Sequence, residues 1–175
     1  MVTVLTPTLP IRSAMLAECK ASVEAQTFRD HSHLVVADDR CYGEATMRNS
    51  LLRLAHTEWV AFLDDDDLFL PHHLETLWNA REGADVVYSD CRVEGLQKHW
   101  TVREFDLDEI RKKNYVSVTV LARRESLLKV GGFRRVPNPD WDLWIRLGGA
   151  GAKFKFVDEV TWVYRVHPGS IIMNQ

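Results

Sequence analysis

The sequence predicts an α/β fold in which a mostly parallel central sheet is flanked by helices. Two observations lead to this prediction. Residues 1–95 alternate between short β-branched runs and segments whose apolar residues recur at helical spacing, and aspartates directly follow two of the predicted strands. Such alternation builds a parallel sheet with helices on both faces, and ligands of these sheets bind at the carboxyl ends of the strands. The sequence therefore places the functional residues at one edge of a sheet.

Apolar patterning and prolines define the elements of residues 1–95. Strands are predicted at residues 2–6, 33–37, 58–63 and 85–89. Helices are predicted at residues 16–26 and 47–55. A third helix begins at Pro71, because a proline lacks an N–H that the first helical position does not need.

Residues 96–175 have a less regular pattern, without a linker or a repeat. Strands are expected at 100–105, 116–122 and 160–166, and helices at 106–113 and 125–130. Asn138, Pro139 and Asp140 form a predicted turn in which Asp140 caps a further helix. We expect one domain over residues 1–175.

Composition narrows the classes of function. The 175 residues, 46% hydrophobic and 27% charged, are typical of a globular protein with its own core. A net charge of −3 does not favour sequence-independent binding to nucleic acid. No apolar run approaches the ~18–20 residues of a membrane span, so we expect no membrane span and a cytoplasmic location. Three cysteines without CxxC spacing indicate reduced thiols rather than disulfides or a zinc site.

Four consecutive aspartates at positions 64–67 form the most informative motif. Neighbouring carboxylates repel one another and are hard to keep ionised together unless a cation lies among them. Their oxygens suit Mg²⁺ or Mn²⁺, and Mg²⁺ usually takes one or two carboxylates together with phosphate oxygens of a substrate. A solvated acidic turn at a helix start is the alternative interpretation.

Three further segments offer candidate side chains, each with a structural alternative. The aspartates at 38–39 end a neighbouring strand, where such a pair is also typical of a turn. His167 could reach a metal or a phosphate, although an isolated histidine is more often a surface residue. Asp140 and Asp142 flank Trp141, where a carboxylate can act as a base or simply begin a helix over a core tryptophan.

Eight ordered segments together carry a family resemblance. They are residues 2–8, 22–27, 35–39, 45–49, 59–67, 131–133, 140–146 and 164–170. In order and spacing they resemble the inverting, GT-A-fold glycosyltransferases of family two over nearly the whole chain. The resemblance implies transfer of one sugar from a nucleoside-diphosphate sugar, with UDP the commonest nucleotide, to an acceptor hydroxyl in a single displacement.

The resemblance also implies roles for the donor-binding residues. Thr6, Pro7 and Asp39 would hold the nucleotide base, and Arg48 would lie near the nucleotide or its diphosphate.

The remaining roles concern the metal and the base. Asp64 and Asp66 would be the outer members of a DxD motif, with Asp65 contacting the ribose or the donor sugar. Asp66 and His167 would bind Mn²⁺ or Mg²⁺. Asp140 would be the general base that removes the acceptor proton.

By the same resemblance, residues 1–95 would bind the nucleotide sugar, and residues 96–175 would supply the acceptor site and the base. The acceptor could be a glycan, a lipid-linked sugar, a protein, a metabolite or a modified nucleic-acid base. Candidate acceptor contacts are the aromatic Trp100, Tyr115 and Phe133 and the basic Arg111, Lys112 and Lys113. The alternative is that the aromatic residues belong to the core and the basic ones to a solvated helix end.

The chain departs from the family pattern in two places. Pro139 stands where many relatives have Glu, which makes Asp142 a reserve candidate for the base, and residues 7–10 lack the aromatic residue and the Asn common in relatives. The absence of further domains predicts a minimal catalytic domain that adds a single sugar.

Two other functions compete with this interpretation. A metal-dependent nucleotidyltransferase usually has a glycine-rich, basic loop after the first strand, and residues 7–12 contain no glycine. A non-catalytic nucleotide-binding module would share the fold but lack a working base.

Overall fold

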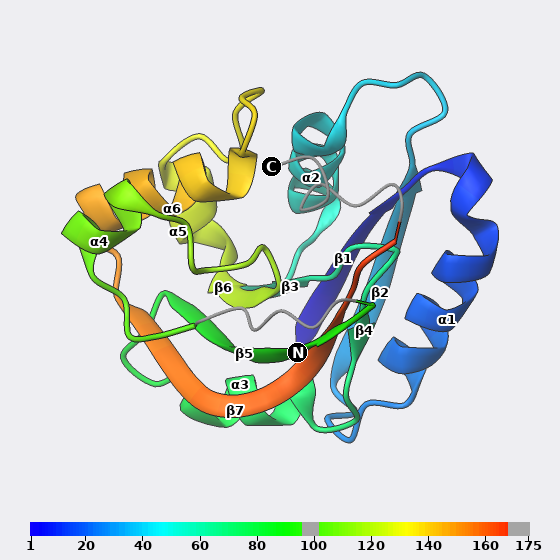
Figure 1. The fold of residues 1–175 in the computed structure, drawn as a ribbon, viewed down its shortest axis with the longest axis horizontal. Helices are drawn as coiled ribbons and strands as arrows, with labels where there is room; N and C mark the ends of the chain where they lie inside the picture. Colours follow the sequence, from blue (N-terminus) through cyan, green and yellow to red (C-terminus); the bar gives the residue numbers. More distant parts are fainter. Residues whose placement is uncertain (96–101, 168–175) are drawn as a thin grey trace.

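A computed structural model describes residues 1–95 and 102–167. In these ranges a seven-stranded sheet has the strand order β2-β1-β3-β6-β5-β7-β4 (Figure 1). The strands are β1 (Val2–Thr8), β2 (His31–Ala37), β3 (Trp59–Phe62), β4 (Leu68–Phe69), β5 (Val86–Glu94), β6 (Val120–Arg123) and β7 (Phe154–Arg165). The helices are α1 (Ser13–Glu24), α2 (Glu44–Leu54), α3 (His73–Ala80), α4 (Leu107–Lys112), α5 (Arg124–Lys129) and α6 (Pro139–Gly149), with a 3₁₀ turn η1 (Pro10–Arg12).

The predicted α/β class is confirmed, and the sheet is mixed rather than purely parallel. β1 pairs in parallel with β2 and β3, and β5 with β7. β6 is antiparallel to both β3 and β5, and β4 is antiparallel to β7. Strand direction depends on the connection that leads into a strand rather than on its own side chains, so the apolar patterns could not reveal it.

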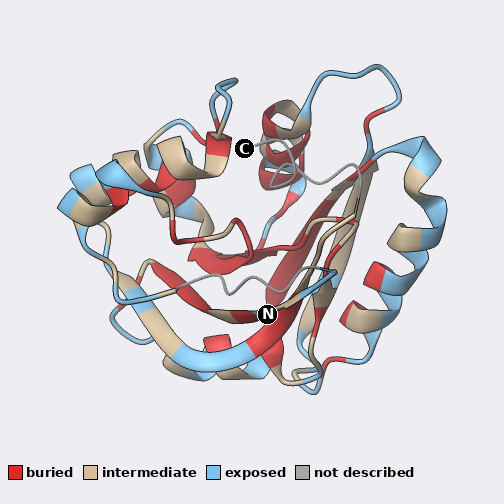
Figure 2. Ribbon diagram, in the orientation of Figure 1, coloured by how far each residue is buried: buried red, intermediate tan, exposed pale blue. Residues whose placement is uncertain are grey.

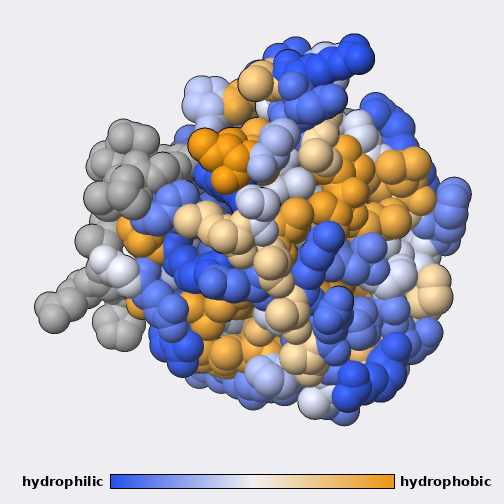
Figure 3. Space-filling model, turned by 90° about the vertical axis from the view of Figure 1, so that its right-hand side faces the viewer, coloured by the Kyte–Doolittle hydropathy of each residue, from blue (hydrophilic) through white to orange (hydrophobic). Residues whose placement is uncertain are grey.

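Alternation along each strand decides which layer of helices a side chain meets. In β3, Val60 and Phe62 join the core beneath α2, α4, α5 and α6, whereas Trp59 and Ala61 join the core against α1 and α3. Buried residues follow the central strands between these layers (Figure 2). On the outer face that carries α1, hydrophilic and hydrophobic side chains are interspersed (Figure 3). Among the described helices, none is both long and apolar enough to cross a membrane.

The second half differs locally from the predictions. Residues 102–105 form no strand, and only the end of the predicted strand at 116–122 pairs, as part of β6. Asp140 is not a helix cap, because α6 already begins at Pro139 and its N-cap residue is Asn138. Pro139 occupies the first helical position, so Asp140 lies inside the first turn.

A clamp joins α2 to the turn that follows α5. The Asn49 side chain accepts a hydrogen bond from the Phe133 amide at 2.9 Å and donates one to the Phe133 carbonyl at 2.8 Å. Gly132 has a φ of +68°, and a Cβ there would lie 2.3 Å from Asn49 Oδ1. Glycine is therefore required at this position by both backbone conformation and space.

Replacement of Gly132 by alanine should destabilise the protein by about 1–3 kcal/mol, since the left-handed φ is strained and the clamp must open. Gly149→Ala is the matched control, because a Cβ at this last residue of α6 meets open space. Its effect should stay within ~1 kcal/mol. Urea unfolding measures both variants, and equal stabilities would contradict the steric argument.

Acid should destabilise the fold through His73. This residue of α3 is fully buried, its Nδ1 lies 2.7 Å from Thr161 Oγ1, and burial lowers its pKa to about 3. In the unfolded chain the pKa of a histidine is ~6.5, so on acidification the unfolded state binds the proton first. The stability contributed by neutral His73 is therefore lost as pH falls from ~6.5 toward about 3.

The measurement is the difference in unfolding free energy between about pH 7.5 and about pH 5, for the wild type and for His73→Leu. The comparison with the variant is needed because burial also raises the pKa of Asp67. Protonation of Asp67 favours the folded state as pH falls, so it opposes the effect of His73 on stability. The variant should lose less stability on acidification than the wild type, and identical losses would exclude the contribution of His73.

Candidate functional site

The four consecutive aspartates follow β3 at the carboxyl edge of the sheet. Leu5 of β1 pairs with Phe62 of β3, and the Leu63 amide donates to the Leu5 carbonyl at 3.2 Å. The acids therefore begin beside the last residues of β1, at the edge where the sequence places them.

Arg48 connects Asp64 to helix α2. Its side chain is buried, Nη2 donates to both carboxylate oxygens of Asp64 at 2.7 and 2.9 Å, and Nη1 lies 3.2 Å from Glu44. Burial alone would lower the pKa of Arg48, but the charges of Asp64 and Glu44 raise it above its ordinary value. This guanidinium is therefore held charged between two elements.

Asp65 and Asp66 share a different cation, Arg12. Nη1 of Arg12 lies 2.8 Å from Asp65 Oδ1 and 2.8 Å from Asp66 Oδ2. Asp65 is 2% exposed, and its Oδ2 accepts a hydrogen bond from the Thr8 hydroxyl at 2.6 Å. Both oxygens of Asp65 are thus engaged, by the end of β1 and by the loop after it. Contact of Asp65 with a ribose or a sugar stays a prediction.

His167 reaches Asp66 from the end of β7. Its Nε2 lies 3.0 Å from Asp66 Oδ2. The buried Asp67 carboxylate accepts the Arg165 amide at 2.9 Å, which fixes the end of β7 against the acid loop. Burial and the charge of Asp64 raise the pKa of Asp66, and the hydrogen bond from His167 opposes this.

Asp66 and His167 have chemistry that suits a divalent cation. Mg²⁺ and Mn²⁺ accept carboxylate and, for Mn²⁺, imidazole ligands, and Mg²⁺ usually completes its shell with water and phosphate oxygens. Within residues 1–95 and 102–167, no three Asp, Glu, His or Cys side chains converge in a metal-binding arrangement. A cation held here would therefore draw further oxygens from a ligand.

Asp140 is half-buried in the first turn of α6, where Asn114 Nδ2 donates to its Oδ2 at 3.2 Å. Burial raises the pKa of Asp140, and the charge of Arg48 opposes this. A carboxylate with a raised pKa is a stronger base at neutral pH. The reserve candidate, Asp142, is instead paired with Arg146, whose Nε lies 2.7 Å from its Oδ2.

The residues expected to hold the nucleotide base differ in exposure. Thr6 is fully buried, and its hydroxyl lies 2.8 Å from His33 Nε2, whereas Pro7 is half-buried. Asp39 is exposed in the turn after β2. Asp38 is buried and accepts two amides of the following loop, at 2.8 and 2.7 Å. The structural role falls to Asp38, and base recognition by Asp39 stays a prediction.

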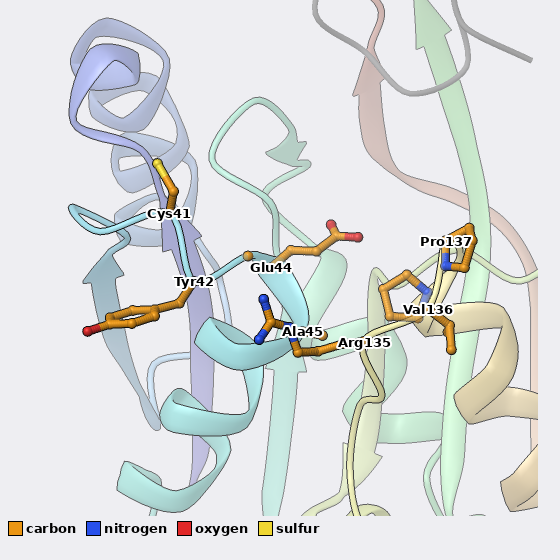
Figure 4. A pocket seen from close by; sticks show the side chains of 9 residues that line it. Cys41, Tyr42, Glu44, Ala45, Arg135, Val136 and Pro137 are labelled. Carbon is orange, nitrogen blue, oxygen red and sulfur yellow. The ribbon is translucent and has the colours of Figure 1, made fainter.

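A pocket of about 340 Å³ lies between the loop that enters α2 and the loop that enters α6 (Figure 4). The Glu44 carboxylate points across this space toward Pro137, and Arg135 extends from the opposite loop toward the start of α2. Pro139 also lines the pocket. The pocket therefore reaches the residue before Asp140 on one side and the partner of Arg48 on the other.

Three residues of this site were not predicted from the sequence. Arg12 is the first basic residue after the first predicted strand, and this position at the carboxyl end was a usable signal. Glu44 precedes Arg48 by four residues, a spacing that brings side chains together on a helix. Asn114 had no signal, because its contact with Asp140 joins distant segments.

The expected acceptor contacts are not part of the pocket. Tyr115 and Phe133 are buried in the core, and Arg111 and Lys112 pair with acids of their own helix. Trp100 lies outside the described residues. The structural alternative is therefore correct for these four described side chains.

Comparison with known proteins identifies the family of this chain. The model of glycosyl transferase family 2 matches residues 40–131, just over half of the chain. The chain is 24% identical over 155 residues to WfaP of Escherichia coli, a UDP-Glc:alpha-D-GlcNAc-diphosphoundecaprenol beta-1,3-glucosyltransferase, covering 84% of this chain and 61% of the relative. It is 24% identical over 151 residues to an uncharacterized glycosyltransferase of Methanocaldococcus jannaschii, covering 79% of this chain and 52% of that protein. The chain thus spans less than two thirds of either relative.

Solved structures show the same fold. S. aureus TarS 1-349 in complex with UDP-GlcNAc matches with a TM-score of 0.80 at 18% identity, over 99% of this chain and 61% of that one. Mannosyltransferase PcManGT from Pyrobaculum calidifontis, in complex with GDP-Man and Mn²⁺, matches with a TM-score of 0.71 at 18% identity, over 97% and 58% of the two chains. The predicted GT-A fold is confirmed. Because the family model matches more than half of the chain, a range that includes the buried arginine and all four aspartates, this chain belongs to glycosyl transferase family 2.

Proposed function

We propose that this chain is a metal-dependent, inverting glycosyltransferase that moves one sugar from a UDP-sugar to an acceptor hydroxyl. One observation carries the proposal: Arg48 binds Asp64 directly, and its charge also acts on Asp140. The acid motif and the candidate base are therefore both within the influence of one buried cation, and a single displacement needs the donor and acceptor groups held close together. The UDP-sugars named with WfaP and TarS support the donor class.

On the donor side, Asp66 and His167 would hold Mn²⁺ or Mg²⁺, in keeping with the Mn²⁺ named with the Pyrobaculum enzyme. The cation supplies positive charge that neutralises the departing diphosphate. Arg48 would provide a fixed cation on the side of Asp64, and Asp39 would accept hydrogen bonds from the nucleotide base. These residues lie at the carboxyl edge of the sheet, where ligands of α/β sheets bind.

On the acceptor side, Asp140 removes the proton of the attacking hydroxyl. The hydroxyl oxygen forms a bond to the anomeric carbon while the bond from that carbon to the diphosphate oxygen breaks on the opposite face, so the configuration inverts. Asn114 fixes one carboxylate oxygen of Asp140. The raised pKa of this carboxylate favours proton transfer at neutral pH.

The pocket beside Pro139 is the proposed entrance for the acceptor. It combines a carboxylate and a guanidinium, from Glu44 and Arg135, with the apolar side chains of Val136 and Pro137. Sugar rings present hydroxyl edges and apolar faces, so this lining suits a glycan or a lipid-linked sugar. The lipid-linked acceptor in the name of WfaP supports that class.

Nucleotide binding is the first test. UDP with Mn²⁺ or Mg²⁺ should raise the midpoint of thermal unfolding, because a ligand at ~100 times its Kd stabilises the folded state by about 2.7 kcal/mol. GDP under the same conditions is the control for base selection. A shift with GDP alone would reassign the donor, and no shift with either nucleotide would contradict the proposed transferase.

Asp140→Asn tests the base. Transfer should fall by a factor of about 10²–10⁴, while the Kd for UDP stays unchanged, because the amide cannot accept the proton. Asp142→Asn makes the same change two residues further along α6. It should mainly lower the stability of the protein, because the ion pair of Asp142 with Arg146 is lost. If transfer survives in Asp140→Asn and disappears in Asp142→Asn, the base is Asp142.

A further inference from the structure

Arg12 occupies an unusual position in the acid cluster. It ends η1, in the loop that follows β1, and its side chain is 26% exposed. A single nitrogen, Nη1, lies 2.8 Å from a carboxylate oxygen of both Asp65 and Asp66. One guanidinium therefore neutralises two adjacent acids that would otherwise repel each other.

The other two acids have partners of their own. Both oxygens of Asp64 accept hydrogen bonds from Arg48, and Asp67 accepts the Arg165 amide. Asp66 is the member of the cluster that shares its oxygen between Arg12 and His167. Arg12 and a divalent cation would thus act on the same carboxylate.

We propose that Arg12 is a built-in counter-ion of Asp66 that competes with the divalent cation and yields its place when a nucleoside diphosphate arrives. This inference rests on the proposed function. A guanidinium so close to Asp66 repels a second cation, so the metal alone should bind weakly. A diphosphate adds the negative charge that lets both cations remain in the site.

The remaining donors of Arg12 suit this exchange. Within the described parts of the chain, its Nε and Nη2 donate to no protein acceptor, while Nη1 is engaged by the two acids. A guanidinium binds phosphate oxygens through paired N–H donors, and the diphosphate would lie next to the cation. Arg12 can therefore turn from a carboxylate to the diphosphate without leaving its loop.

The rival role is purely structural. A cation could bind the other oxygen of Asp66, with Arg12 holding the two carboxylates in place. The two roles predict opposite changes in cation affinity when Arg12 is replaced. Removing a competitor tightens cation binding, whereas removing a positioning residue weakens it.

The experiment measures Mn²⁺ binding by electron paramagnetic resonance, with and without UDP, for the wild type and for Arg12→Gln. The variant should bind Mn²⁺ alone about tenfold tighter than the wild type, and should gain less affinity when UDP is added. Arg92→Gln removes the same charge from an exposed pair with Glu94 and should match the wild type.

A second measurement uses the wild type alone and does not depend on how the variant folds. The Arg12 Nε–H resonance in a ¹⁵N NMR spectrum should shift when Mg²⁺ and UDP are added together. Unchanged or weaker Mn²⁺ affinity in folded Arg12→Gln, or an Nε–H resonance that does not move, would overturn the inference. Failure of UDP to bind the wild type would instead reject the proposed function.

Discussion

The burial of Arg48 is the constraint on which the site depends. Removing a guanidinium from water is costly, and here the cost is offset by direct contact with Asp64 and Glu44. The charge of Arg48 also opposes the rise that burial causes in the pKa of Asp140, so its electrostatic influence extends to the start of α6. Loss of Arg48 would leave Asp64 and Glu44 without their shared guanidinium partner.

The four adjacent aspartates have different roles because each has different contacts. Asp67 is buried and anchors the end of β7, and Asp65 is buried and anchors the loop after β1. Asp64 accepts both of its hydrogen bonds from Arg48, whereas Asp66 lies between Arg12 and His167. A run that looks uniform in sequence therefore contains structural carboxylates and one that is suited to a ligand.

The mixed sheet explains how distant segments reach this edge. β6 enters antiparallel between β3 and β5, and α5 and α6 pack on the same face as α2. β7 runs along β5 with register shifts near Asp90 and finishes beside the acids, so that His167 lies next to Asp66. The topology thus brings residues about a hundred positions apart into hydrogen-bonding distance.

The α/β class, the family resemblance and the position of the acids at the end of a strand were predictable from the sequence. These features depend on short-range patterns, namely alternating apolar periodicities and aspartates next to a β-branched run. The folded chain was needed to reveal the direction of β6, the pairing of Arg12 with the acids, and the burial of Tyr115 and Phe133 in the core. Those features arise from contacts between residues far apart in the chain, and local periodicity carries no information about which distant side chain will supply the opposite charge or the covering surface.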